Sequence, residues 1–155
     1  MFTLIPIIQI KYMEVSTMYE FMVKFNPEKN CVKEFEHWLV CVRAKQVTLG
    51  DAIILLKREV PSMAEMTTEE SAEFAQVIAW YEKKCKTLFG ATKFNYVVAM
   101  MKDNFVHYHA FPRYKEATTW NGTEWIDQDW PRLVQFRDVE VPEQMLDAIN
   151  KALKD

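Results

Sequence analysis

The chain is 155 residues long, and 50% of its residues are hydrophobic. This length and hydrophobicity are enough to bury a core, which excludes intrinsic disorder and predicts a single domain over residues 1–155. The formal net charge is −3 and the Lys and Arg residues form no block, so a nucleic-acid polymer is not an expected partner, whereas a small phosphate compound is compatible.

The first segment of the chain is apolar but short. The apolar run in residues 1–12 ends at Lys11, whereas a membrane-spanning helix needs about 20 apolar residues. The segment also lacks the basic start and the small-residue cleavage site of a signal peptide. We therefore expect an edge strand or flexible arm at 1–12 and no membrane as a partner. Next, Ser16 is predicted to cap a short helix that runs to Phe25.

Two strands are predicted in the next part of the chain. Residues 34–43 read as a strand that places His37 and Cys41 on the same face. Residues 51–57 form a continuous apolar run between turn signals, which predicts a central strand covered on both sides. His37 either faces a functional site or forms a hydrogen bond near the surface, and the sequence leaves both alternatives open.

The strongest helix signal spans residues 68–89. Thr67 is a suitable N-cap, and Glu70 three positions later completes a capping box. Apolar residues then recur at steps of three and four, as on one side of an amphipathic helix; they are Phe74, Val77, Ile78, Tyr81, Cys85 and Leu88. Gly90 lies where a helix C-cap glycine is expected.

A hairpin is predicted after this helix. Residues 94–101 read as a strand, and the polar residues 102–104 read as a tight turn into a second strand at 105–113. Strands, a long helix, more strands and a last helix together indicate an α+β domain built on an antiparallel sheet.

Aromatic residues are dense in the segment after the hairpin. Residues 115–135 read as a loop region that contains Trp120, Trp125 and Trp130. These tryptophans either form a lid over a bound base or partner, or pack the C-terminal segment onto the sheet. A helix is then predicted at 142–154, opened by a proline.

Two of the three histidines lie in the predicted strand 105–113. Because side chains alternate along a strand, His107 and His109 point to the same face as Phe105 and Phe111. Buried imidazoles need polar partners. The pair therefore indicates a catalytic or binding site, and the alternative is a structural polar pair at a sheet edge. A neutral imidazole can act as a nucleophile, a general base or a metal ligand near neutral pH.

The residues around the pair favour phosphate chemistry over metal binding. A zinc site needs three or four protein ligands, and His37 is the only other histidine, so we expect no metal. Attack by one histidine on a phosphoryl group needs hydrogen-bond donors rather than an acidic cluster. Asn95, on the neighbouring strand, could supply such a donor.

The histidine strand resembles a known motif. The run VHYHAFPRY, from Val106 to Tyr114, resembles the end of the histidine-triad motif of HIT-family nucleotide hydrolases and transferases, in which three histidines alternate with apolar residues. Upstream segments match in the same order: Gln46 to Gly50, Lys57 to Ser62, the helix capped by Thr67, and Phe94 to Tyr96. The resemblance extends over residues 34–114, about half of the chain.

The resemblance implies a fold and a mechanism. The fold is a HIT-like antiparallel β-sheet with one long capped helix and a C-terminal helix, and residues 115–155 form a C-terminal extension. His107 looks like the middle triad histidine, which attacks the α-phosphate of a nucleotide and forms a covalent nucleotidyl-histidine. His109 looks like the last triad histidine, which contacts phosphate oxygens. Asn95 matches a position near ribose or phosphate, so the implied substrate-binding residues are Asn95 and His109.

The implied substrate is a small nucleotide compound, such as a dinucleoside polyphosphate or a nucleoside phosphoramidate. The implied activity is that of a phosphohydrolase or nucleotidyl transferase without a cofactor. Many HIT proteins are homodimers that share a continuous sheet, so a homodimer is expected. The cysteines, Cys31, Cys41 and Cys85, form no C-x-x-C pair and fit the reduced thiols of a cytoplasmic protein better than disulfides.

Two residues depart from the family pattern. Phe105 occupies the first triad position, where the family has a histidine that supports the nucleophile by hydrogen bonding. A phenyl ring cannot do this, although a backbone carbonyl could replace it. Glu59 also stands where many relatives carry a histidine. The alternative functions are therefore a non-catalytic nucleotide-binding module, or a metal-binding protein that uses His107 and His109.

Overall fold

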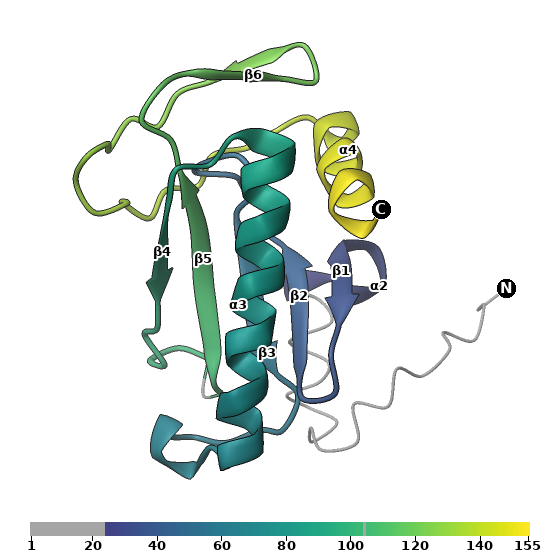
Figure 1. Ribbon diagram of the computed structural model, residues 1–155, viewed down its shortest axis with the longest axis vertical. Helices are drawn as coiled ribbons and strands as arrows, with labels where there is room; N and C mark the ends of the chain where they lie inside the picture. The colour runs from purple at the N-terminus through teal and green to yellow at the C-terminus, as the bar shows by residue number, and fades with distance from the viewer. Residues whose placement is uncertain (1–23, 104) are drawn as a thin grey trace, which may run out of the picture.

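The computed structural model describes residues 24–103 and 105–155. Two predictions lie outside the described residues: the strand or arm at 1–12, and most of the helix from Ser16. Figure 1 shows the described elements. In chain order they are α2 (Pro27–Asn30), β1 (Cys31–Glu34), β2 (Trp38–Val42), β3 (Ala52–Leu56), the 3₁₀ helix η1 (Met63–Glu65), α3 (Thr68–Phe89), β4 (Lys93–Val97), β5 (His107–Arg113), β6 (Thr118–Trp120), β7 (Thr123–Trp125) and α4 (Glu143–Lys154).

A five-stranded sheet forms the centre of the fold. Its strand order is β1-β2-β3-β5-β4, and every neighbouring pair is antiparallel. All residues of β2 and β3 are buried, as expected for strands covered on both sides. β6 and β7 form a separate two-stranded sheet. These elements confirm the predicted α+β architecture with an antiparallel sheet, one long helix and a C-terminal helix.

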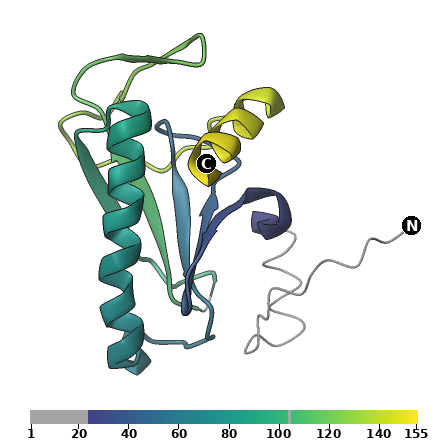
Figure 2. The same ribbon diagram turned by 45° about the vertical axis from the view of Figure 1, so that its right-hand side comes forward.

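The long helix α3 covers one face of the sheet (Figures 1 and 2). Its predicted capping box is present: Thr67 Oγ1 accepts a hydrogen bond from the Glu70 N–H at 3.1 Å, and the Glu70 carboxylate accepts one from the Thr67 N–H at 2.9 Å. Gly90 follows the helix with a φ of 77°, the left-handed conformation that favours glycine. The main core lies between α3 and the sheet and includes Trp38, Val40, Val42, Ile54, Leu56, Val77, Tyr81 and Phe89.

The opposite face of the sheet carries the two histidines of β5. Directly opposite residues of antiparallel strands share a face, and the register joins Cys41 to Ile53 and Ile53 to His109. A second, smaller apolar cluster lies on this face and consists of Leu39, Cys41, Ile53, Leu55 and Phe105. We call this surface, away from α3, the histidine face.

The region 34–43 differs from its prediction. The sequence predicts one strand, whereas the structure has a hairpin in which residues 35–37 turn between β1 and β2. The turn is held by α3, because the Glu73 carboxylate accepts hydrogen bonds from the N–H groups of Glu36 and His37 at 3.1 and 2.6 Å. Since the partner is distant in the chain, no local pattern indicates this turn.

The predicted pairing of the two strands after α3 is confirmed, but the predicted turn between them is wrong. β4 ends at Val97 and β5 begins at His107, so residues 98–106 form a longer connection in place of a tight turn at 102–104. Met100 has a φ of 47°, which is incompatible with an extended strand at this position.

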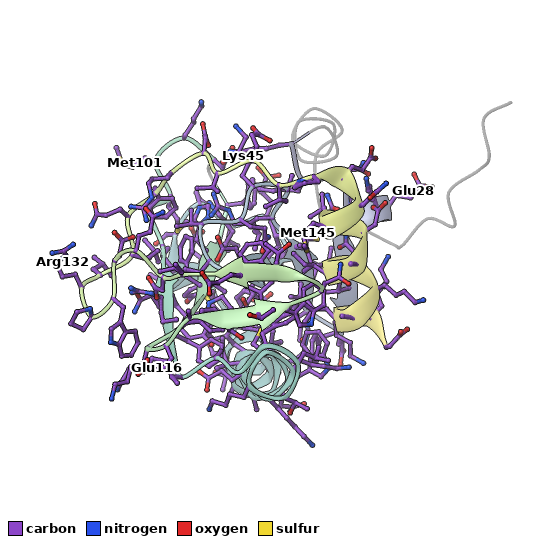
Figure 3. All side chains as sticks on the ribbon, turned by 90° about the horizontal axis from the view of Figure 1, so that it is seen from above. Glu28, Lys45, Met101, Glu116, Arg132 and Met145 are labelled. Atoms are coloured by element: carbon purple, nitrogen blue, oxygen red, sulfur yellow. The ribbon has the colours of Figure 1, made fainter. Side chains whose placement is uncertain are left out.

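The C-terminal segment belongs to the same core. The β6–β7 hairpin lies against the end of α3, where the Thr118 hydroxyl donates to the Phe89 carbonyl at 3.1 Å. Figure 3 shows this hairpin from above, with α3 seen end-on beside it and α4 at one side. The buried side of α4 joins the main core through Met145, Leu146, Ile149 and Leu153. No helix among the described residues is long and apolar enough to cross a membrane.

Candidate functional site

His107 is the first residue of β5 and is almost fully buried, with 3% of its surface exposed. Its Nδ1 atom lies 2.8 Å from the carbonyl oxygen of Phe105. Because a carbonyl can only accept a hydrogen bond, the neutral imidazole has its proton on Nδ1 and its lone pair on Nε2. The backbone of Phe105 therefore supplies an orienting partner that its phenyl ring cannot supply.

His109 lies on the same face, two positions further along β5. Its ring meets the His107 ring edge-on, with centroids 5.2 Å apart. Within the described part of the chain, His109 Nδ1 is buried and has no hydrogen-bond partner. Burial, together with the nearby charges of Arg43 and His107, lowers the pKa of His109 to about 4. The imidazole is therefore neutral near pH 7, and one of its ring nitrogens is not bonded to any described protein group.

An aromatic ring and a cation border the histidine pair. The Phe136 ring meets the His109 ring edge-on, with centroids 5.0 Å apart. The Arg43 guanidinium lies over the rings of Phe111 and Phe136, at 5.3 and 5.8 Å from their centroids, which is cation–π geometry. Sequence reasoning missed Arg43 and Phe136. Neither belongs to a recognisable motif, and Phe136 comes from a segment without regular secondary structure.

The turn between β2 and β3 supports Arg43. Arg43 forms an ion pair of 3.5 Å with Asp51, a fully buried carboxylate whose pKa burial raises to about 7. The Asp51 carboxylate also accepts a hydrogen bond from the Thr48 hydroxyl at 2.6 Å. Gln46 closes the turn, because its side-chain oxygen accepts from the Gly50 N–H at 2.8 Å. These bonds fix the backbone that presents Arg43 to the histidine face.

Asn95 lies on the histidine face of β4, opposite Phe111 in the register. Its side-chain oxygen accepts hydrogen bonds from the Arg113 guanidinium and, at 3.3 Å, from the Val134 N–H. Arg113 is itself buried and forms a bidentate ion pair with Asp127 at 2.6 and 3.0 Å. The network fastens the C-terminal segment to β4 and β5. The contact of Asn95 with ribose or phosphate stays a prediction.

The third histidine does not join the pair. His37 lies in the turn between β1 and β2, with Nε2 3.9 Å from the Glu36 carboxylate and 31% of its side chain exposed. Its backbone is tied to α3, on the other side of the sheet. Among residues 24–103 and 105–155, no group of three His, Cys, Asp or Glu side chains is placed to hold a metal ion.

Two of the three tryptophans after β5 pack on the helix side of the sheet. Trp120 meets the Phe89 ring edge-on, with centroids 5.0 Å apart. Trp125 packs against the same main core. These two residues therefore follow the packing alternative and do not cover the histidine face.

Solved structures share this fold. A histidine triad protein from Marinobacter aquaeolei VT8 has a TM-score of 0.67 and 16% sequence identity, over 85% of this chain and 90% of that chain. A hypothetical histidine triad nucleotide-binding protein from Sulfolobus tokodaii has a TM-score of 0.64 and 15% sequence identity. The match covers 88% of this chain and 89% of that chain. The diadenosine triphosphate hydrolase of Plasmodium falciparum, in complex with cyclomarin A, has a TM-score of 0.58 and 16% sequence identity. The match covers 82% of this chain and 75% of that chain. No protein-family model and no curated protein matches the sequence. The structural matches show that the chain has the fold of histidine triad proteins.

Proposed function

We propose that this protein is a HIT-like nucleotide phosphohydrolase or nucleotidyl transferase that works through a covalent nucleotidyl-His107. The observation that carries the proposal is the 2.8 Å contact between His107 Nδ1 and the Phe105 carbonyl. In the neutral ring this contact places the proton on Nδ1, so that Nε2 carries the lone pair that attacks phosphorus. The fold shared with histidine triad proteins supports the same assignment.

The proposed reaction consists of two displacements. In the first, His107 Nε2 forms a bond to the α-phosphorus while the bond from that phosphorus to the leaving group breaks. In the second, water or another acceptor attacks the phosphorus and loses a proton, and the N–P bond breaks to return neutral His107. Each displacement depends on positioning and on stabilising charge at the phosphate oxygens.

His109 and Arg43 are the residues that would stabilise this charge. The neutral His109 would donate its ring N–H to a phosphate oxygen, because its Nδ1 has no partner among the described residues. Arg43 supplies positive charge at the same end of the histidine face, next to the Phe136 ring that contacts His109. Both groups are held in place before a ligand arrives, which is the condition for effective electrostatic stabilisation.

The reaction requires a substrate with two parts. A nucleotidyl group remains on His107 while the other part departs, as in a dinucleoside polyphosphate or a nucleoside phosphoramidate. One structural neighbour is a diadenosine triphosphate hydrolase, which supports the first of these classes. We propose a small nucleotide compound of this kind as the substrate.

A non-catalytic nucleotide-binding module is the second candidate. It is favoured by the burial of the proposed nucleophile, since His107 is only 3% exposed. It is also favoured by Phe105 at the first triad position. Such a protein would bind nucleotide near His109 without forming the N–P bond, so formation of this bond separates the two candidates.

The deciding experiment follows the covalent adduct. The full chain is incubated with dinucleoside polyphosphates and nucleoside phosphoramidates and quenched at alkaline pH, where the N–P bond persists. Intact mass is then recorded and released nucleotide is quantified. We expect a mass increase of one nucleotidyl group and turnover in the wild type, and neither in His107→Ala.

His37→Ala is the matched control, because it removes a histidine from the turn between β1 and β2, outside the histidine pair. It should keep both the adduct and the turnover. Calorimetry with the same compounds completes the test. Saturable binding without adduct or turnover would establish the binding module, and absence of binding would reject both candidates.

A further inference from the structure

Cys31 and Cys41 face each other across two strands. Cys31 is the first residue of β1, and the register makes Cys41 of β2 its direct partner. Opposite residues of antiparallel strands have Cα atoms about 4.5 to 5.5 Å apart, and disulfides join residues with Cα atoms about 4.4 to 6.8 Å apart. Both thiols are free. The positions of the two cysteines along the chain do not indicate this pair, which only the hairpin brings together.

The two side chains also point to the same side of the sheet. The register continues from Cys41 to Ile53 and from Ile53 to His109, which places both cysteines on the histidine face. Cys41 is fully buried in the small apolar cluster of this face, and the half-buried Cys31 packs against that cluster. Cys31 is therefore the more exposed of the two cysteines, and Cys41 lies buried beside it.

The two thiols differ in acidity. Contact with the Cys41 thiol lowers the pKa of Cys31. Contact with Cys31, together with burial, raises the pKa of Cys41. Because the thiolate is the reactive form of cysteine, Cys31 is the nucleophile of the pair.

We propose that Cys31 and Cys41 form a peroxide-sensitive dithiol, in which a hydroperoxide oxidises Cys31 and Cys41 then closes a disulfide between β1 and β2. In the first step the Cys31 thiolate attacks the peroxide and the O–O bond breaks. Cys31 becomes a sulfenic acid, and the other oxygen takes a proton from solvent and leaves as alcohol or water. In the second step the Cys41 sulfur attacks the Cys31 sulfur and the S–O bond breaks. The departing hydroxide takes the Cys41 proton and leaves as water. A cellular thiol reductant would reverse the reaction.

The test uses hydrogen peroxide and the full chain. After treatment, remaining thiols are alkylated under denaturing conditions and the protein is digested with trypsin, which cuts after Lys29, Lys33 and Arg43. Cys31 and Cys41 then lie in different peptides, which stay joined only through a disulfide. We expect this joined pair in the wild type, with loss of two hydrogen atoms in intact mass. We also expect Cys31 to be alkylated at least about tenfold faster than Cys85 in the native protein.

Three variants make the result specific. Cys85→Ala should still form the disulfide, because Cys85 lies in the main core on the helix side. Cys41→Ala should stop at a sulfenic acid on Cys31, trapped by a dimedone probe, and Cys31→Ser should leave Cys41 unoxidised. The proposal fails if the joined peptides contain Cys85 or come from two chains in a mixture of isotope-labelled and unlabelled protein. It also fails if folded wild type keeps both thiols under peroxide that oxidises free glutathione completely.

Discussion

Phe105 contributes two different groups to the candidate site: a backbone carbonyl and a phenyl ring. The carbonyl orients His107 Nδ1, and any residue type at this position provides one. The ring packs in the small cluster on the histidine face together with Leu39, Ile53 and Leu55. The side chain at position 105 therefore affects the packing beside the proposed nucleophile more than it affects the orientation of the His107 ring.

This distinction predicts the effect of a histidine at position 105. Phe105→His should lower the free energy of unfolding by about 1–3 kcal/mol, because it places a polar ring in an apolar cluster where the phenyl ring is 5% exposed. Adduct formation should change by less than about tenfold, since the backbone carbonyl remains. Urea denaturation and the single-turnover rate measure the two effects. Phe105→Leu is the apolar control, and a rate increase above about 100-fold in Phe105→His alone would show that the first imidazole itself acts.

The buried, neutral His109 predicts a dependence of stability on pH. Its pKa is about 4 in the folded protein and about 6.5 in an unfolded chain. Between these values the unfolded chain binds a proton that the folded protein does not bind, so the free energy of unfolding falls as the pH falls. The pKa of Asp51 is raised to about 7, so Asp51 makes the free energy of unfolding rise as the pH falls over the same range. The effect of His109 must therefore be separated from that of Asp51 by comparison with a variant.

The comparison is between the wild type and His109→Gln, by urea denaturation at intervals between about pH 7 and pH 4. The wild type should lose more stability than the variant as the pH is lowered, while the contribution of Asp51 cancels in the difference. If the free energy of unfolding changes with pH in the same way in both proteins, His109 is not held neutral in the folded protein. Addition of a nucleoside monophosphate should raise the pKa of His109, measured by NMR, because a phosphate next to the ring favours its charged form.

At the scale of elements, the Arg113–Asp127 pair joins β5 to the segment that leads into α4. Its side chains are 3% and 1% exposed, so neither charge can be hydrated when the other is removed. Asp127→Asn should therefore lower the free energy of unfolding by about 3–5 kcal/mol. Asp138→Asn is the matched control, because its ion pair with Lys45 is exposed to solvent, so that its loss should leave the free energy of unfolding nearly unchanged. Equal effects in urea denaturation would contradict the structural role of the buried pair.

Asn95 allows a structural role and a binding role to be separated. Asn95→Asp keeps an oxygen that can accept from Arg113 and from the Val134 N–H, so it should retain most of the stability. It removes the amide donor and adds negative charge, so it should weaken nucleotide binding at least about tenfold if Asn95 contacts phosphate. Asn95→Ala should weaken both properties. Calorimetry and urea denaturation measure them independently, and unchanged affinity in Asn95→Asp would limit the residue to fastening the C-terminal segment.

Elements with local signals were predictable from the sequence. The caps of α3 depend on residues three positions apart, and the apolar run of β3 indicates its central place in the sheet. The alternation that places His107 and His109 on one face is equally local. The turn between β1 and β2 was not predictable, because its amides bind a carboxylate of α3. The end of β4 also differs, because apolar residues continue beyond the point where the backbone leaves the sheet.

At the scale of the whole molecule, contacts between distant segments complete the candidate site. Phe136 reaches His109 because Asp127, Arg113 and Asn95 hold its segment against β4 and β5. Arg43 joins the same group from the end of β2. Each of these residues is an ordinary polar or aromatic residue in the sequence, and its role follows only from the path of the folded chain. The same holds for Cys31 and Cys41, which the β1–β2 hairpin makes neighbours.

We propose that the predicted homodimer forms through one edge of the sheet, the edge made by β4. β1 and β4 are the two edge strands. α4 packs beside β1, whereas within the described part of the chain β4 pairs only with β5. The outer backbone groups of β4 can therefore form hydrogen bonds with a strand of a second copy of the chain. We therefore expect light scattering to give the mass of two chains. Hydrogen exchange at β4 amides should become faster on dilution, while exchange at β1 stays constant. A single-chain mass across the concentration range would contradict the dimer, and faster exchange at β1 would move the interface to the other edge.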